Sequence, residues 1–430
     1  MRRTSLLMPI AALVGLSWIP SDPAAEPVKN TVPAWTHWRG PSGQGYVEDA
    51  RVPLTWSEKD NVLWKTKLPG SGKSSPIVWG DRVFLTAAGD KGGERYVLCV
   101  RTTNGEILWK QTAAKGVNQE KTHAWNGYAS ASCTTDGKYV YAFFGTPGLF
   151  CYDLDGKLIW KHEFGTFIEG GWGTAASPFL FEDLVIQNCD NEGTGAGDAP
   201  QALVAFDKTT GKVRWTAPRN LGRGFSTPRL IPVAGGRVDL VLNGNQALIG
   251  YDPKTGKEMW RCMRTGDSAR YGEPLPVNDA ETMFVISGRP GPNHALRLPD
   301  KGDVTKTHVL WEGKRKARDV SSPILWEGLV YQADSQGNLT CWEMKTGKEV
   351  FATRISRGKS LGSPIVVRGK LLFLMDDGTT IVLEPGREMK IVGENKLDGG
   401  PLDFGASPAV VDGKLYLRSQ SYLYCIGEKR

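Results

Sequence analysis

Short stretches of alternating apolar and polar residues, separated by turns rich in glycine and aspartate, make up the chain from Asn61 onward. One unit recurs: a Ser-Pro-like pair opens a first strand, and a Gly/Asp turn leads to a second. The third strand ends in a small residue, and a Gly-containing turn leads into a fourth strand that carries Trp. No stretch after the N-terminal segment shows sustained helical periodicity, and a period of two indicates strands. The pattern therefore predicts an all-β protein of repeated four-stranded units.

The openings of this unit give the number of repeats. They lie at Ser75-Pro76, Ser132, Ser177-Pro178, Thr227-Pro228, Glu273-Pro274, Ser322-Pro323, Ser363-Pro364 and Ser407-Pro408. Their spacing is about 47 residues, in the range of β-propeller blades. The last unit supplies three strands, and the missing fourth lies in NVLWKTKL, where Trp64 takes the Trp position. We predict an eight-bladed β-propeller of four-stranded antiparallel blades, closed by the N-terminal strand around Trp64 beside the strand around Cys425.

The turn before each fourth strand has its own signature. TTNGEILW, DLDGKLIW, TTGKVRW and KTGKEMW place the aromatic residue four positions after Gly, at Trp109, Trp160, Trp215 and Trp260. Gly provides the positive φ that a tight turn between antiparallel strands requires, and Trp buries a large flat surface between sheets. KTGKEVF places Phe351 there instead. Two blades are irregular: the fifth has an insertion before Trp311, and the seventh lacks the Trp.

The seven cysteines are explained by the same repeat. Four of them, Cys99, Cys151, Cys341 and Cys425, occupy one repeat position, which Ala205 and Gly250 fill in other blades. Equivalent positions on successive blades are too far apart to pair, so we expect small buried thiols there. A disulfide among Cys133, Cys189 and Cys262 stays open.

The N-terminal residues predict export. MRRTSLLMPIAALVGLSWIP has a basic start and an apolar stretch too short for a comfortable membrane span, which is typical of a signal peptide. We assign residues 1–25 to it, with cleavage after Ser17 or near Ala24-Ala25, and residues 26–430 to one propeller domain. No cysteine follows the apolar stretch, so no lipid anchor is expected. The expected location is periplasmic or extracellular, without a membrane anchor.

The charge pattern excludes one class of partner. The formal net charge is +7, but no run of Lys and Arg forms a nucleic-acid footprint. The densest cluster, Lys314-Arg315-Lys316, fits a solvated loop. We therefore expect no nucleic-acid partner, and we expect a monomer.

The unit A-x-D-x-x-T-G-K-x-x-W resembles the tryptophan-docking repeat of quinoprotein alcohol dehydrogenases and of the lipoprotein propeller that assists outer-membrane β-barrel assembly. The resemblance extends from Trp38 to Gly427, and WRGPSGQG is similar to secreted pyrroloquinoline-quinone-like repeat proteins. It implies the propeller fold. The chain lacks the adjacent cysteines and the haem-attachment C-x-x-C-H associated with the dehydrogenases, and the lipidated cysteine of the assembly protein. Neither function transfers by motif, and no cofactor is assigned; pyrroloquinoline quinone and calcium stay open.

One loop has metal-binding chemistry. NCDNEGTGAGD places Asp190, Glu192 and Asp198 in a glycine-rich stretch whose oxygen ligands would suit calcium. Its spacing matches no known calcium loop, so we favour an exposed connection. The five histidines are dispersed without metal-binding spacing.

In a propeller, the connections from each outer strand to the next inner strand converge on one face around the channel mouth. In this chain they carry Lys73, His123, Trp125, Asn126, Tyr128, Trp172, Arg223, Phe225, Arg270, Tyr271, Arg318, Asp319, Lys359, Asp403 and Phe404. Cations and aromatic rings recur, which suits an anionic, partly flat ligand. The alternative is that each charge is simply solvated.

No catalytic set is recognisable, so the leading hypothesis is a non-catalytic binding or scaffold propeller of the cell envelope. Its partner at the channel face would be an anionic small molecule, a glycan or an envelope protein. The first alternative is a pyrroloquinoline-quinone-dependent oxidoreductase. The second is a polysaccharide-binding or polysaccharide-processing propeller.

Overall fold

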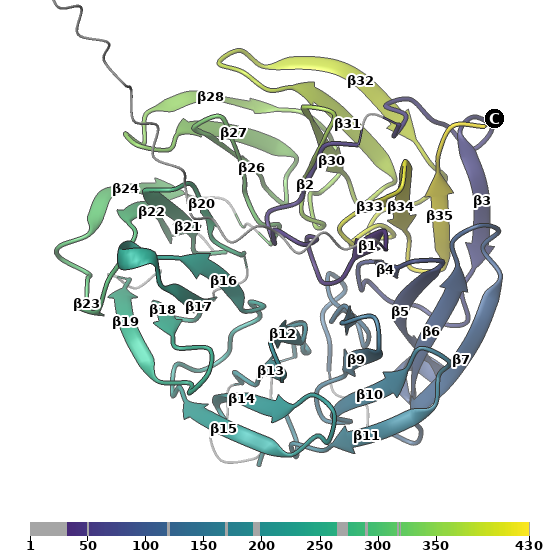
Figure 1. The fold of residues 1–430 in the computed structure, drawn as a ribbon. Helices are drawn as coiled ribbons and strands as arrows, with labels where there is room; N and C mark the ends of the chain where they lie inside the picture. Colours follow the sequence, from purple (N-terminus) through teal and green to yellow (C-terminus); the bar gives the residue numbers. More distant parts are fainter. Residues whose placement is uncertain are drawn as a thin grey trace, which may run out of the picture. The chain divides into compact units, whose positions relative to one another are not determined.

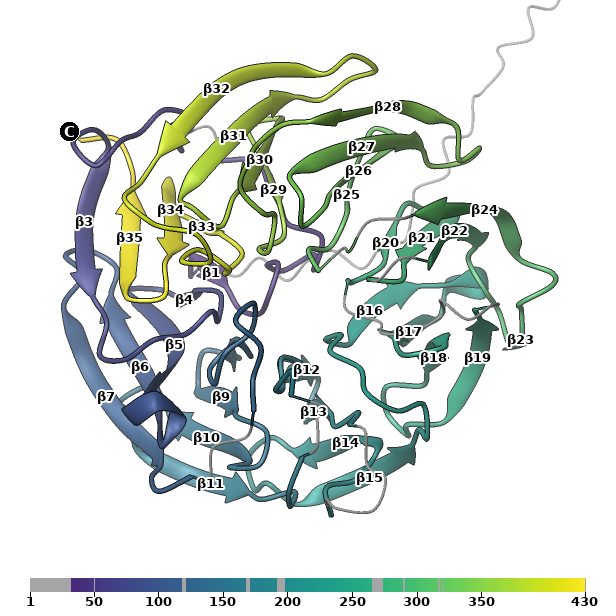
Figure 2. The same ribbon diagram turned by 180° about the vertical axis from the view of Figure 1, so that it is seen from behind.

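A computed structural model describes residues 32–49, 51–117, 121–167, 171–191, 198–264, 274–288, 291–315, 318 and 320–429. Eight small sheets are arranged in a ring, and the strands within each blade run antiparallel (Figures 1 and 2). The predicted eight-bladed propeller is confirmed. In the described ranges the only helical segments are two 3-10 turns, η1 (Asp90–Gly92) and η2 (Ala234–Gly236). Within those ranges, no helix has the length and apolar character needed to cross a membrane.

The first four blades follow the chain order. Blade 1 contains β4 (Ile77–Trp79), β5 (Arg82–Gly89), β6 (Glu94–Arg101) and β7 (Ile107–Ala114). Blade 2 contains β8 (Thr134–Thr135), β9 (Tyr139–Phe143), β10 (Leu149–Asp153) and β11 (Leu158–His162). Blade 3 contains β12 (Phe179–Phe181), β13 (Leu184–Asn188), β14 (Ala202–Asp207) and β15 (Val213–Pro218). Blade 4 contains β16 (Arg229–Pro232), β17 (Val238–Asn243), β18 (Ala247–Tyr251) and β19 (Glu258–Met263).

The remaining blades complete the ring. Blade 5 contains β20 (Val277–Asn278), β21 (Thr282–Ile286), β22 (Gly291–Arg297) and β24 (Val309–Arg315). Blade 6 contains β25 (Ile324–Trp326), β26 (Leu329–Ala333), β27 (Asn338–Glu343) and β28 (Glu349–Arg354). Blade 7 contains β29 (Ile365–Val367), β30 (Lys370–Leu374), β31 (Thr379–Glu384) and β32 (Lys390–Lys396). Blade 8 contains β33 (Ala409–Val411), β34 (Lys414–Arg418), β35 (Tyr422–Ile426) and β3 (Val62–Lys67).

Ring closure occurs as predicted. Strand β3 forms the outer strand of blade 8 and pairs antiparallel with β35, with Trp64 opposite Cys425. The first and last strands of the propeller therefore share one sheet, and β35 has no open edge. The insertion in blade 5 contains a short strand, β23 (Gly302–Asp303), which pairs parallel with β19 of blade 4.

The repeated Trp side chains connect each blade to the next. On β7, Trp109 lies opposite the small residue Cys99, and its indole Nε1 donates to the Leu154 carbonyl of blade 2 at 2.9 Å. Gly156 in that turn has a φ of +87°, and a Cβ there would lie 2.9 Å from the Trp109 ring. Gly is thus needed both for the turn and for the close approach of the ring. The indoles of Trp64, Trp160 and Trp311 dock in the same way on carbonyls of the following blade.

The cysteine prediction is confirmed as well. Cys99, Cys151, Cys341 and Cys425 lie on the third strands of their blades, each opposite the aromatic residue of the fourth strand. All seven cysteines are free and buried, so no disulfide forms among Cys133, Cys189 and Cys262. At the same position a Cβ on Gly250 would lie 2.2 Å from the Trp260 indole, which explains why this position takes small residues.

The opening residues form a chain of hydrogen bonds between blades. The backbone N–H of Ser75 donates to the Ser132 hydroxyl at 2.8 Å, and the same link recurs from blade to blade. In blade 5 the linking N–H belongs to Leu275, which donates to the Ser322 hydroxyl at 2.9 Å. The opening of this blade is therefore Leu275-Pro276, and the predicted opening at Glu273-Pro274 is wrong. Two successive X-Pro pairs occur there, and only the second is followed directly by an inner strand.

An N-terminal segment that the repeat does not predict lies inside the ring (Figures 1 and 2). Its strand β1 (Ala34–Trp35) pairs with the inner strand of blade 1, and β2 (Tyr46–Val47) pairs parallel with the inner strand of blade 7. Between these ends the segment contacts other blades: Thr36 accepts from Thr134 of blade 2, and Gln44 accepts from the backbone of Asn278 in blade 5. We call residues 33–47 the central segment.

Candidate functional site

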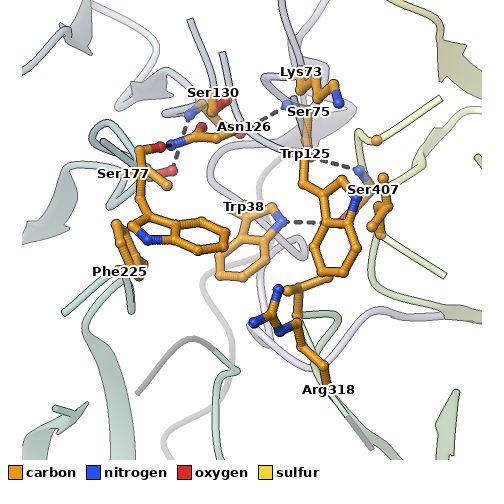
Figure 3. Close-up of a pocket in the computed structure, with 16 residues that line it drawn as sticks. Trp38, Lys73, Ser75, Trp125, Asn126, Ser130, Ser177, Phe225, Arg318 and Ser407 are labelled. Carbon is orange, nitrogen blue, oxygen red and sulfur yellow. Dashed lines mark hydrogen bonds between the residues drawn. The ribbon is translucent and has the colours of Figure 1, made fainter. Parts of the chain in front are cut away.

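A pocket lies at the mouth of the channel, between the central segment and the inter-blade connections (Figure 3). Its volume is about 160 Å³, room for on the order of ten water molecules or one ring-sized ligand. Its lining includes Trp38, Lys73, Trp125, Asn126, Trp172, Phe225, Arg318, Leu361 and Gly405. Apart from Trp38, these residues come from connections that join an outer strand to the next inner strand. Several of the residues predicted for the channel face are therefore brought together.

Aromatic rings and one guanidinium form the centre of this pocket. The guanidinium of Arg318 lies 5.2 Å from the centre of the Trp125 ring and 5.3 Å from that of the Trp172 ring. His123 stacks on Trp172 with the two ring centres 4.2 Å apart, and it meets Trp125 edge-on. The positive charge of Arg318 thus lies against two aromatic faces. Its sequence neighbour Asp319 lies outside the described residues.

A second cation lies at the side of the pocket. The Lys73 ammonium donates to the Ala124 carbonyl at 2.6 Å. Burial lowers the pKa of Lys73 to about 8, against the opposing effect of the Asp376 and Asp403 carboxylates. Near neutral pH this ammonium therefore remains mostly protonated, and it can donate further hydrogen bonds.

Polar atoms without partners add binding capacity. The Oδ1 atom of Asn126 and the hydroxyl of Ser130 are buried and have no hydrogen-bond partner in the described part of the chain. The Nδ2 atom of Asn126 is fixed because it donates to the Trp172 carbonyl at 2.7 Å. Buried polar atoms cost stability unless they are paired, so these two groups are suited to a ligand or to water.

The carboxylate that balances this face is Asp376, which sequence reasoning missed. It is almost fully buried, accepts the Lys359 N–H at 2.7 Å and the Leu402 N–H at 3.0 Å, and faces the Lys359 ammonium at 3.8 Å. Asp403 accepts from the Gln420 backbone instead, at 3.0 Å. Lys359 is thus neutralised beside the pocket and does not line it.

The remaining predicted residues are placed elsewhere or lie outside the described residues. Tyr128 packs under the Arg95 guanidinium, 4.9 Å from its ring centre. Arg223 is buried with its guanidinium 5.9 Å from the ring of Phe225, which does line the pocket. Phe404 packs against Tyr424. Arg270, Tyr271 and Asp319 lie outside the described residues.

The calcium candidates are also accounted for. Asp190 is buried and forms an ion pair with Arg219 at 2.7 Å, while burial raises its pKa. Asp198 accepts the Thr166 N–H at 2.6 Å. Glu192 lies outside the described residues. Among the residues that are described, no group of three His, Cys, Asp or Glu side chains is placed to hold a metal ion.

Trp38 is the main site residue that sequence reasoning missed. It belongs to the central segment, and its indole Nε1 donates to the Ser407 hydroxyl at 3.1 Å. Trp38 lines the pocket together with Trp125 and Arg318 (Figure 3). The sequence feature that could have identified Trp38 is its position in WRGPSGQG, a stretch that does not belong to the repeat.

The architecture and this pocket define the class of protein: an eight-bladed β-propeller with a ligand-sized pocket at one channel mouth. A family model described as "Outer membrane protein assembly factor BamB", built on pyrroloquinoline-quinone-like repeats, matches residues 43–166, 93–261, 200–320 and 303–421. The chain belongs to this family of pyrroloquinoline-quinone-like repeat propellers. A search of curated proteins found none that matches the sequence.

Solved structures with this fold have different functions. The chain is similar to a europium-containing methanol dehydrogenase, with 12% identity, a TM-score of 0.68, and coverage of 92% of this chain and 98% of that one. It is similar to BamB from Moraxella catarrhalis, with 14% identity, a TM-score of 0.61, and coverage of 85% and 99%. It is also similar to the quinohemoprotein alcohol dehydrogenase of Comamonas testosteroni, with 12% identity, a TM-score of 0.61, and coverage of 93% and 81%. At these identities the likeness shows the fold alone.

Proposed function

We propose that this chain is an exported, non-catalytic binding propeller that takes an anionic, partly flat ligand in the channel-mouth pocket. The observation that carries the proposal is the position of the Arg318 guanidinium over Trp125 and Trp172. Flat apolar faces favour a ring, and a guanidinium that has no carboxylate partner among the described residues favours an anionic group on that ring. Lys73 also lines the pocket and supplies a second positive charge.

The lack of catalysis is inferred from what surrounds these cations. The pocket lining consists of three tryptophans, Phe225, Asn126, serines, aliphatic residues, a glycine and two cations, and it includes no carboxylate or histidine among the described residues. Asp376 is held by backbone N–H groups, and His123 is stacked on a ring. A proton-transferring group would need to reach the ligand within hydrogen-bond distance.

Export rests on the N-terminal sequence and on the family. The basic and apolar start of the chain is typical of a signal peptide, and the matching family is described as an outer-membrane assembly factor. We propose a periplasmic or extracellular location.

A quinone-dependent oxidoreductase is the second candidate. The observation that favours it is the similarity in fold to two dehydrogenases, together with a pocket of aromatic walls and cations. A flat carboxylated quinone would fit the same chemistry as the leading proposal, so binding alone does not separate the two.

The test combines titration with an activity assay. Purified mature protein is titrated by calorimetry with pyrroloquinoline quinone, with a glucuronate oligosaccharide and with a neutral glucose oligosaccharide. We expect an anionic probe to bind and to weaken as salt rises, because exposed charges are screened over about 8 Å at physiological ionic strength. Equal binding of the neutral sugar would favour a polysaccharide-binding propeller.

The activity arm adds quinone, calcium and a dye acceptor to the protein with methanol, ethanol or glucose as substrate. No turnover is expected. Turnover above a heat-denatured control would favour the oxidoreductase, and the absence of binding by every anionic probe would overturn the leading proposal.

A further inference from the structure

Four serines that line the channel-mouth pocket come from consecutive blades of the ring. They are the opening residues Ser407, Ser75, Ser132 and Ser177 of blades 8, 1, 2 and 3 (Figure 3). Each is linked to the next by its backbone N–H, which donates to the following hydroxyl at 2.8 or 2.9 Å. Because these links join neighbouring residues directly, the four side chains form one continuous series at the pocket, which we call the serine arc.

The oxygen atoms of the serine arc already act as acceptors. A serine hydroxyl has one proton to donate and two lone pairs that accept. The oxygen of each serine in the arc accepts a backbone N–H from the preceding blade. The Ser407 oxygen accepts twice, from the Ser363 N–H at 2.8 Å and from the Trp38 indole Nε1 at 3.1 Å, so both of its lone pairs are used. A ligand atom next to Ser407 can therefore only receive its proton.

The protons of these hydroxyls have no acceptor among the described residues. None of the four hydroxyls donates to a described group, and the four residues are at most 4% exposed. The hydroxyl of Ser130, which also lines the pocket, is buried and has no described partner at all. A buried donor that makes no hydrogen bond costs stability, so the serine arc is suited to a ligand group that accepts.

A carboxylate matches the serine arc better than a sugar hydroxyl does. An ionised carboxylate has no proton to place, and its two oxygens can accept from several donors at once. A sugar hydroxyl brings a proton of its own, for which Ser407 has no free lone pair. Lys73 lies two residues before Ser75 and also lines the pocket, and its positive charge favours an anionic acceptor over a neutral one.

We propose that the serine arc binds a second carboxylate of the ligand, and that the pocket therefore selects a small aromatic dicarboxylate. One carboxylate is bound by Arg318 and the other by the serine hydroxyls, while the ring lies against the tryptophans. The pocket volume of about 160 Å³ suits a single ring with two such groups. This inference rests on the proposed function, because it concerns the same pocket and adds the class of ligand that the pocket prefers.

The first test uses the parent protein and does not require that any variant folds. Calorimetry compares benzene-1,3-dicarboxylate and benzene-1,4-dicarboxylate with benzoate and with 3-carbamoylbenzoate, in which a neutral amide replaces one carboxylate. We expect the better dicarboxylate to bind at least about tenfold more tightly than 3-carbamoylbenzoate, because charge-assisted hydrogen bonds to the serine arc are lost in the amide.

The outcomes of this test separate the two proposals. Equal binding of the dicarboxylates, benzoate and 3-carbamoylbenzoate overturns the selection of a dicarboxylate and leaves the proposed function standing. Absence of binding by all four probes also overturns this inference, and the titrations with pyrroloquinoline quinone and glucuronate then decide the proposed function on their own.

The second test removes one hydroxyl from the serine arc and measures the ratio of the affinities for the dicarboxylate and for 3-carbamoylbenzoate. Ser132→Ala should lower this ratio by about fivefold. Ser132→Thr should restore it, because Thr227 forms the same inter-blade link in blade 4. A general loosening of the pocket weakens both probes and leaves the ratio unchanged, so the ratio reports on the hydroxyl itself.

The matched control is Ser363→Ala. Ser363 is as buried as Ser132 and its hydroxyl accepts the Ser322 N–H at 2.9 Å in the same kind of link, but Ser363 does not belong to the pocket lining. Its variant should keep the ratio of the parent protein. A ratio that stays at the parent value in Ser132→Ala, or that falls equally in Ser363→Ala, overturns the proposal.

Discussion

The tryptophans of the outer ring and those of the channel mouth have different surroundings. In the outer ring Trp160 is nearly buried, lies opposite the small residue Cys151, and donates to the Lys208 carbonyl of the next blade at 3.1 Å. At the mouth, Trp125 and Trp172 are only half-buried, and their faces point toward the guanidinium of Arg318. The outer arrangement recurs from blade to blade, whereas the mouth arrangement occurs once.

This difference suggests that the two groups of tryptophans have different roles, one in the stability of the fold and one in ligand binding. A Trp that recurs with a Gly turn and a small cross-strand residue is part of the packing between blades. Trp38, Trp125 and Trp172 lie outside the repeat, in the central segment or in inter-blade connections, and they line the pocket. Trp35 of the central segment is instead buried in the core. A Trp that belongs to the repeat is thus a packing residue, whereas a Trp outside it can take either role.

The largest effect is expected from removing the strand that closes the ring. Deletion of residues 59–68 removes β3 and exposes the edge of β35. We expect no cooperative thermal unfolding transition and association in size-exclusion chromatography. Trp64→Phe keeps the strand and should retain a transition at lower temperature. A deletion protein that melts like the parent would refute the closure argument.

The next largest effect is expected when a Trp of the outer ring and a Trp of the channel mouth are each replaced by Ala and the losses of stability are compared. Trp160→Ala should lower the free energy of unfolding by roughly 3–5 kcal/mol, as for other emptied aromatic sites. Trp172→Ala should lower it by much less, because its ring is half-exposed. Urea denaturation of both variants measures the difference. Equal losses would show that both tryptophans have a structural role.

A smaller effect is expected at Arg318. Arg318→Gln should weaken binding of an anionic probe by about tenfold, or ~1.4 kcal/mol, and should leave stability within about 0.5 kcal/mol of the parent. The control is Arg214→Gln, because Arg214 is exposed on blade 3 and pairs with Asp183 and Asp207. Calorimetry should find its affinity unchanged. If both variants bind alike, Arg318 takes no part in recognition.

The smallest effect concerns pH. Since burial lowers the pKa of Lys73 to about 8, its ammonium loses its proton as pH rises through 8. Anion affinity should therefore fall between about pH 7 and pH 9. The stability of the folded protein should not fall over the same range, because loss of the proton relieves the cost of burying the charge. Lys73→Met should remove the pH dependence of binding. A parent affinity that stays constant over this range would exclude Lys73 from the site.

The repeat explains why so much of the fold could be predicted. The spacing of the openings predicted the number of blades, and Trp64 identified the strand that closes the ring. Cys99 and its equivalents marked a buried position on the third strand, opposite the Trp of the fourth. Strand order in a propeller also placed Trp125 and Arg318 on one face. These features follow from a local pattern that recurs many times.

The parts that could not be predicted lie where the repeat provides no reference. Trp38 is placed by contacts of the central segment with several blades, and no local pattern encodes these contacts. Asp376 lies in a tight turn, and only tertiary structure turns it toward Lys359. In blade 5 two X-Pro pairs follow each other, and the choice of Leu275 depends on its hydrogen bond to Ser322.

The most direct test of the binding proposal is a crystal structure of the parent protein with its tightest anionic probe, pyrroloquinoline quinone or a glucuronate oligosaccharide. The account predicts that the ligand ring lies against Trp125 or Trp172 and that an anionic group lies within hydrogen-bond distance of the Arg318 guanidinium. A ligand bound on the outer ring, or one in the pocket with its anionic group directed away from Arg318 and Lys73, would contradict it.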